Sequence, residues 1–97
     1  ISECEKSKNT YEFVISDNTI RPSELTVERC DEITIINKDD KNRLLAFGEH
    51  ENHDDYQNLS ELPIGKDKTV KFTAASPGKF IIHDHYQEVI SATFIVR

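Results

Sequence analysis

Histidine is the residue type in this chain whose spacing most clearly suggests chemistry. The four histidines form two pairs, His50 with His53 and His83 with His85. In a strand, residues i and i+2 point to the same side, about 6.6–6.8 Å apart, so the imidazoles of an H-x-H pair can turn toward one ion. A spacing of three suits a turn or the start of a helix. The two pairs together predict one metal site held by the two strand histidines and one or two loop histidines, which makes all four candidate ligands.

Carboxylates flank both pairs. We expect them to accept the second ring N–H of the imidazoles and so to orient them; they are Glu49, Asp54, Asp84 and Glu88. Imidazole ligands suit Cu(II), Zn(II) and Ni(II), and affinity favours copper among these. Copper is therefore the predicted ion and zinc the alternative. A third interpretation is that the histidines are surface residues of a polar protein and bind no metal.

Composition excludes several classes of partner. The chain has 97 residues, 12 basic and 18 acidic, for a net charge of -6. Such a surface repels phosphate, so we expect no nucleic-acid partner. No apolar run approaches the roughly 20 residues that span a bilayer, so we expect no membrane insertion. The length fits one domain, residues 1–97, and a chain without methionine is expected to be a processed or trimmed one.

The two cysteines, Cys4 and Cys30, are 26 residues apart and match no zinc or C-x-x-C pattern. A disulfide would tie an N-terminal extension, residues 1–10, to the rest of the domain, and closing this loop is worth about 3.5 kcal/mol. A disulfide predicts an extracytoplasmic location: periplasmic, secreted or cell-surface. The alternative is two unpaired buried thiols in a cytosolic protein.

The elements that would position these residues are strands. Apolar residues alternate with polar ones in short runs separated by turn signals, which predicts an all-β antiparallel sandwich or barrel; the runs are residues 11–16, 25–27, 32–37, 70–72, 79–85 and 92–96. Residues 48–62 are polar and predict a long loop with a helical turn near 56–62. If Phe80 and Ile82 face the core, then His83 and His85 point to the opposite face. The loop would have to fold over that face to complete the metal site.

The sequence motifs of the predicted strands resemble those of the cupredoxin family. Cupredoxins open with P-x-x-L-x-V and D-x-V-x-F-x-N words, matched here by residues 22–27 and 31–37. They close with P-G-x-Y-x-F-x-C-x-x-H-x-x-M, whose first half matches residues 77–82. The resemblance covers about residues 11–97. It implies a Greek-key β-sandwich or barrel of the cupredoxin type.

The ligand positions of the usual type-1 copper site are all changed. Counting from Gly78, the cysteine ligand falls on Asp84, the second histidine on Gln87 and the methionine on Ile90. The first histidine falls on Arg43 or Leu44. A thiolate-bound blue copper centre is therefore excluded by the residues themselves.

The chain also looks like a subgroup of small bacterial cupredoxin-like proteins with H-x-x-H-x-x-Y and H-D-H words. Here these read His50 to Tyr56 and His83 to His85. This likeness implies a copper site built from histidines on the usual scaffold. The predicted function is copper trafficking, sequestration or electron transfer, with a redox or copper-transfer protein as a further partner.

Two other functions stay open at this point. One is a copper-dependent redox enzyme, such as a superoxide dismutase, in which Arg43 would steer the anion toward the metal. The other is a zinc-binding or metal-free structural domain. Whether the protein is an enzyme is left open, and binding is preferred over catalysis.

Overall fold

The computed structural model describes residues 4, 9–49, 52–53, 56–57, 59–87 and 90–97. Within these residues the chain consists of strands and turns, with no helix and hence none long and apolar enough to cross a membrane. The strands are β1 (Thr10–Ser16), β2 (Thr19–Arg21), β3 (Glu24–Val27), β4 (Glu32–Asn37), β5 (Arg43–Glu49), β6 (Asn52–His53), β7 (Glu61–Ile64), β8 (Thr69–Thr73), β9 (Gly78–Asp84) and β10 (Ser91–Val96).

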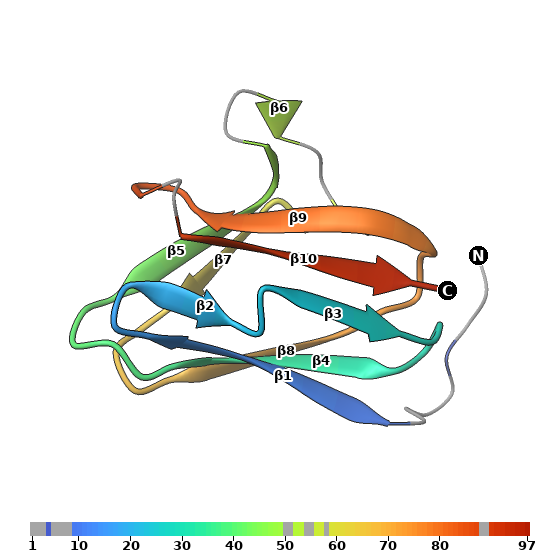
Figure 1. Cartoon of the computed structure of the whole chain (residues 1–97), viewed down its shortest axis with the longest axis horizontal. Coiled ribbons are helices and arrows are strands. Elements are labelled where there is room, and N and C mark those ends of the chain that lie inside the picture. Colours follow the sequence, from blue (N-terminus) through green and yellow to red (C-terminus); the bar gives the residue numbers. More distant parts are fainter. Residues whose placement is uncertain (1–3, 5–8, 50–51, 54–55, 58, 88–89) are drawn as a thin grey trace.

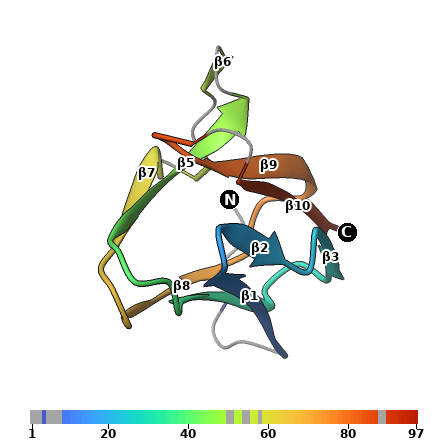
Figure 2. The same cartoon turned by 60° about the vertical axis from the view of Figure 1, so that its left-hand side comes forward.

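The strands form two packed sheets, which confirms the predicted all-β sandwich (Figure 1). One sheet has the order β2-β1-β4-β8, and the other has the order β3-β10-β9-β5-β6 with β7 also paired to β5. Most neighbours are antiparallel, but β1 runs parallel to β4 and β3 runs parallel to β10. Figure 2 shows the two layers from a second side, with β6 projecting beyond the sandwich.

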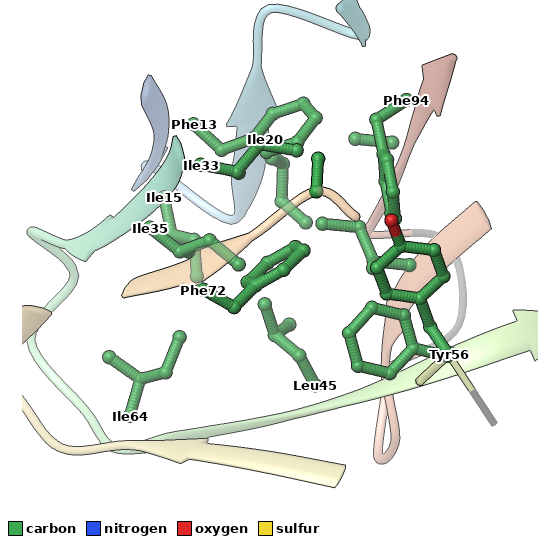
Figure 3. Packing of buried hydrophobic residues seen from close by; sticks show 14 of the residues in the cluster. Phe13, Ile15, Ile20, Ile33, Ile35, Leu45, Tyr56, Ile64, Phe72 and Phe94 are labelled. Carbon is green, nitrogen blue, oxygen red and sulfur yellow. The ribbon is translucent and has the colours of Figure 1, made fainter. Parts of the chain in front are cut away.

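The core lies between the sheets and follows the period-2 pattern of the sequence. Phe13 and Ile15 of β1 and Ile33 and Ile35 of β4 are fully buried, while their strand neighbours are more exposed. Figure 3 shows these side chains packed against Phe72 and, from the facing sheet, Leu45, Ile64 and Phe94.

Several parts of the strand pattern differ from the prediction. β2 and β6 were not predicted, because at three and two residues they are too short to show alternation. β5 was not predicted, because its contiguous apolar run Leu44–Leu45–Ala46–Phe47 shows no alternation. The helical turn predicted near residues 56–62 is wrong: Tyr56 and Leu59 form an isolated β-bridge. The chain continues into β7, whose pairing with β5 satisfies backbone groups that a helix would have bonded internally.

The predicted disulfide is confirmed, with the Cα atoms of Cys4 and Cys30 at 5.3 Å. Next to it, the buried carboxylate of Asp31 accepts the backbone N–H of Asn9 at 3.1 Å and that of Glu28 at 2.9 Å. The N-terminal segment is therefore held to the sandwich both covalently and by hydrogen bonds.

Candidate metal centre

Strand β9 places His83 on the face of its sheet that points away from the core. Its neighbour Ile82 pairs with Phe47 of β5, and both are core residues. His83 pairs with Ala46, so the pleat turns these two residues to the opposite face, as the sequence predicted. The side chain of His83 is nevertheless only 2% exposed. The protein itself therefore covers this part of the outer face.

A backbone carbonyl orients the His83 ring. Its Nδ1 lies 2.8 Å from the carbonyl oxygen of Gly48, the residue two positions after Ala46 on β5. Because a carbonyl only accepts, Nδ1 carries the proton, and in the neutral imidazole the lone pair is then on Nε2. Gly48 has a φ of +90°, a backbone conformation that side chains disfavour. Glycine thus lets this carbonyl meet the ring.

Of the other predicted histidines, His53 and His85 are placed by the structure and His50 is not. His53 belongs to β6 and pairs with Gly48. His85 follows β9; its backbone N–H donates to the carbonyl of Leu44 at 2.7 Å, and its ring contacts that of Tyr86 edge to face. His50 lies outside the described residues.

The carboxylates expected to orient the imidazoles are placed only in part. Glu49 ends β5 and stands opposite Asn52 of β6. Asp54 and Glu88 lie outside the described residues. Among the side chains that the structure does describe, no three from His, Cys, Asp and Glu gather closely enough to hold a metal ion. The predicted four-histidine site therefore stays a prediction, with His83 as its best-defined member.

Asp84, the next residue on β9, faces the interior and binds Arg43. The Asp84 carboxylate lies 3.1 Å from Nη1 of Arg43. Its other oxygen accepts the backbone N–H groups of Tyr86 at 2.8 Å and Gln87 at 3.2 Å, which shapes the start of the β9–β10 connection. Asp84 thus pairs with a cation of the chain itself and braces a turn.

Arg43 is the centre of a larger cluster at this end of the sandwich. Its side chain is 2% exposed, and the guanidinium also bonds Gln87 Oε1, Asn18 Oδ1 and Asp39 Oδ2, each at 2.6 Å. We call these five residues, Asn18, Asp39, Arg43, Asp84 and Gln87, the end cluster. The predicted role of Arg43 in steering an anion stays a prediction, and its burial between two carboxylates weighs against it.

Asp39 is held in the end cluster by both charge and backbone contacts. Burial alone would raise the pKa of its carboxyl, but the hydrogen bond from Arg43, the backbone N–H of Asn18 and the charge of Arg43 lower it below the ordinary value of 3.8. The Asn37 side chain, buried under the same loop, accepts the N–H of Asp39 at 3.0 Å and donates to the carbonyl of Ile64 at 3.0 Å. Asn37 therefore fixes the loop that presents Asp39.

A surface hollow of about 430 Å³ borders the end cluster. It is lined by Asp17, Asn18, Lys38, Asp39, Asp40 and Lys41. Three of these residues are acidic and two are basic, so the hollow carries no strong charge of one sign.

Tyr56, the last residue of the H-x-x-H-x-x-Y word, is a core residue. Its ring lies among Phe47, Phe72, Phe80 and Phe94, with the centroid of Phe80 at 4.4 Å. Its hydroxyl donates to the carbonyl of Ser76 at 2.9 Å. Burial raises the pKa of Tyr56 above its ordinary value of 10.0. This residue anchors the segment that carries the loop histidines.

Sequence reasoning missed three residues that these contacts make important. Gly48 was overlooked, although it is one of only three glycines and directly precedes the H-x-x-H segment. Asn18 and Asp39 were treated as turn residues. No local signal relates them to Arg43, because they come from separate turns that only the folded sandwich brings together.

Comparisons with known proteins agree with this architecture. A family model for the cupredoxin-like domain matches residues 2–96. The fold is similar to a reduced Cu(I) form of an amicyanin mutant at pH 4, with a TM-score of 0.75 and 18% identity over 96% of this chain and 87% of that chain. A Cu(I) form of another amicyanin mutant gives a TM-score of 0.73 and 17% identity, covering 89% and 80% of the two chains. No curated protein sequence matches.

Proposed function

Because the chain belongs to the cupredoxin-like domain family, we propose that it is an extracytoplasmic copper-binding protein whose ligands are histidines. The observation that carries this proposal is the contact between His83 Nδ1 and the Gly48 carbonyl. Metal-binding histidines almost always donate their second ring N–H to a carbonyl or a carboxylate, which fixes the tautomer that binds the ion. His83 has this arrangement with the Gly48 carbonyl.

The sheet register supports His53 as a partner for His83. The two residues pair with Gly48 and Ala46, which are two positions apart on β5. Strand spacings put their Cα atoms about 12 Å apart, a separation that two imidazoles can bridge through one ion. The corresponding spacing between His53 and His85 is about 17 Å. We therefore assign the site to His83 with His50 and His53, and give His85 the smallest contribution.

Copper trafficking or sequestration fits this donor set better than fast electron transfer. Both cysteines of the chain are bonded to each other, so no thiolate is available to a metal. Copper bound by imidazoles alone lacks the thiolate bond of blue copper centres. The amicyanin structures named above are copper proteins of the same fold, which supports copper over zinc. The disulfide supports an oxidising compartment, and a copper-transfer protein is the partner we expect.

The test is a titration of the metal-free protein with Cu(II) and, separately, with Zn(II). We expect tighter binding of Cu(II) and an electron paramagnetic resonance spectrum of nitrogen ligation without a thiolate absorption band. The variants His50→Ala, His53→Ala and His83→Ala should each lower copper affinity by at least the 10–100-fold typical of losing a residue that merely orients a ligand. His85→Ala should lower it least.

A matched control separates ligation from folding. His83 is buried, so its replacement also removes packing, and thermal unfolding of each metal-free variant must be measured beside its affinity. Tighter binding of zinc would overturn the copper assignment. Copper affinity that is unchanged in His83→Ala, in a variant that remains folded, would overturn the site.

A further inference from the structure

The end cluster uses the hydrogen-bonding capacity of one cation almost completely. The terminal nitrogens of Arg43 carry four N–H groups. Nη1 donates to Asp84 and Gln87, and Nη2 donates to Asn18 and Asp39, at 2.6–3.1 Å. All four acceptors are oxygens, and two of them are carboxylate oxygens. Each terminal N–H thus has an oxygen of its own.

These acceptors come from separate parts of the chain. Asn18 lies in the β1–β2 turn, Asp39 in the β4–β5 connection, Asp84 at the end of β9 and Gln87 in the β9–β10 connection. A single buried guanidinium therefore links both sheets at one end of the sandwich. Joining strand ends through one cation is a role that a bound metal ion can also have.

The positions involved are the ones at which a cupredoxin carries copper ligands. Counting along the motif words placed the first histidine at position 43 or 44, the cysteine at 84 and the second histidine at 87. In the folded chain, Arg43 contacts both Asp84 and Gln87 directly. The fourth position, Ile90, is buried and apolar. The motif count and the contacts identify the same place.

We propose that the Arg43 guanidinium is a built-in cation that stands where the fold would otherwise hold a type-1 metal ion. This end of the sandwich is then stabilised without copper and is closed to it. A metal within bonding distance of the four oxygens would overlap the guanidinium and repel its charge. The shell left without Arg43 is all oxygen, which suits hard cations better than copper. The inference does not depend on the histidine site.

The first experiment removes the built-in cation and supplies a free one. Arg43→Ala leaves Asp39 and Asp84 buried without their counter-charge, so we expect its melting temperature to fall by more than about 10 °C. Millimolar methylguanidinium chloride should raise the melting temperature of Arg43→Ala by several degrees, because it binds among the oxygens that Arg43 has vacated. Sodium chloride at the same ionic strength is the reference. Methylguanidinium should not raise the melting temperature of the unmodified protein.

Arg97→Ala is the matched control. Arg97 also pairs with a carboxylate, Glu28 at 2.8 Å, but its side chain is 69% exposed. We expect a shift of only a few degrees and no response to methylguanidinium. An equal response of both variants to the added cation, or no response of a folded Arg43→Ala, would overturn the proposal.

A second experiment does not require Arg43→Ala to fold. The double variant Asp84→Cys with Gln87→His restores two ligand types but keeps Arg43, and the triple variant adds Arg43→His. Titration with Co(II) should give a thiolate charge-transfer band in the triple variant and none in the double variant. A band of equal strength in both would show that the guanidinium does not occupy the metal position. A folded triple variant without the band would contradict the proposed location.

Discussion

His83 and Asp84 are consecutive residues of β9, yet they lie on opposite faces of the sheet and make different interactions. Asp84 faces the interior and pairs with the permanent cation of Arg43. His83 faces outward and presents an imidazole whose ring is oriented by the Gly48 carbonyl. The pleat of one strand separates the two environments. One strand can therefore place a carboxylate against a cation of the chain itself on one face of a sheet and an imidazole donor on the other.

The largest effect should come from removing Asp84. Asp84→Ala leaves part of the buried Arg43 charge uncompensated and removes the acceptor for two backbone N–H groups of the β9–β10 connection. We expect the free energy of unfolding of the metal-free protein to fall by about 3–5 kcal/mol. Urea denaturation without metal would measure this loss.

Glu28→Ala is the control for that prediction. Glu28 also pairs with an arginine, but its side chain is 51% exposed, so its loss should cost less than about 1 kcal/mol. Equal losses of unfolding free energy in the two variants would mean that the buried end cluster stabilises the protein no more than an exposed ion pair does.

A smaller effect is expected on the outward side, at Gly48. Gly48→Ala places a side chain at a φ of +90°, which should lower stability by roughly 1–2 kcal/mol. Because the carbonyl that orients His83 would shift, copper affinity should also fall by about 10–100-fold. Copper titration and urea denaturation measured side by side would separate the two effects.

Gly65→Ala provides the control for Gly48. An added Cβ at Gly65 would lie 3.3 Å from the flexible side chain of Lys68 and far along the chain from His83. It should change stability slightly and copper affinity not at all. A fall in copper affinity equal to that of Gly48→Ala would mean that the Gly48 carbonyl has no special role.

The smallest effect concerns Asp39 and appears only in acid. Its pKa is lowered in the folded protein, so the stability that it contributes is fully present above the ordinary, unfolded value of 3.8. That contribution is lost as the pH falls through the lower, folded pKa. Asp39→Asn should therefore show a weaker loss of stability below about pH 4 than the unmodified protein.

Thermal unfolding of both proteins from pH 2 to 6 would test this prediction. The chain has many other carboxylates, so the difference between the two curves is the relevant quantity. Parallel curves would mean that the contact between Asp39 and Arg43 contributes nothing to acid stability.

The sheets were predictable because alternation is a local property of the chain. The β4 run predicted at residues 32–37 agrees with the structure, and the predicted disulfide is present. β5 was not predictable, since its buried apolar run has no period. The parallel pairs β1–β4 and β3–β10 were missed for a different reason: alternation does not encode which strands become neighbours.

The site was predictable only where one strand contains it. The outward direction of His83 followed from the parity of Phe80 and Ile82. The role of Gly48 did not, because it depends on a carbonyl of the neighbouring strand. The end cluster likewise joins residues up to 69 positions apart, Asn18 and Gln87, through a guanidinium that the sequence shows only as one more basic residue.

The placement of the tyrosines has an optical consequence. The chain has no tryptophan, so its near-ultraviolet signal comes mainly from tyrosine. Tyr56 is 1% exposed and fixed among phenylalanine rings, whereas Tyr86 is 77% exposed and its N–H binds Asp84. Near-ultraviolet circular dichroism should therefore report on the packing around Tyr56, and quenching of fluorescence by a water-soluble agent should report on Tyr86. Tyr56 thus reports damage to the core, and Tyr86 reports a change next to the end cluster.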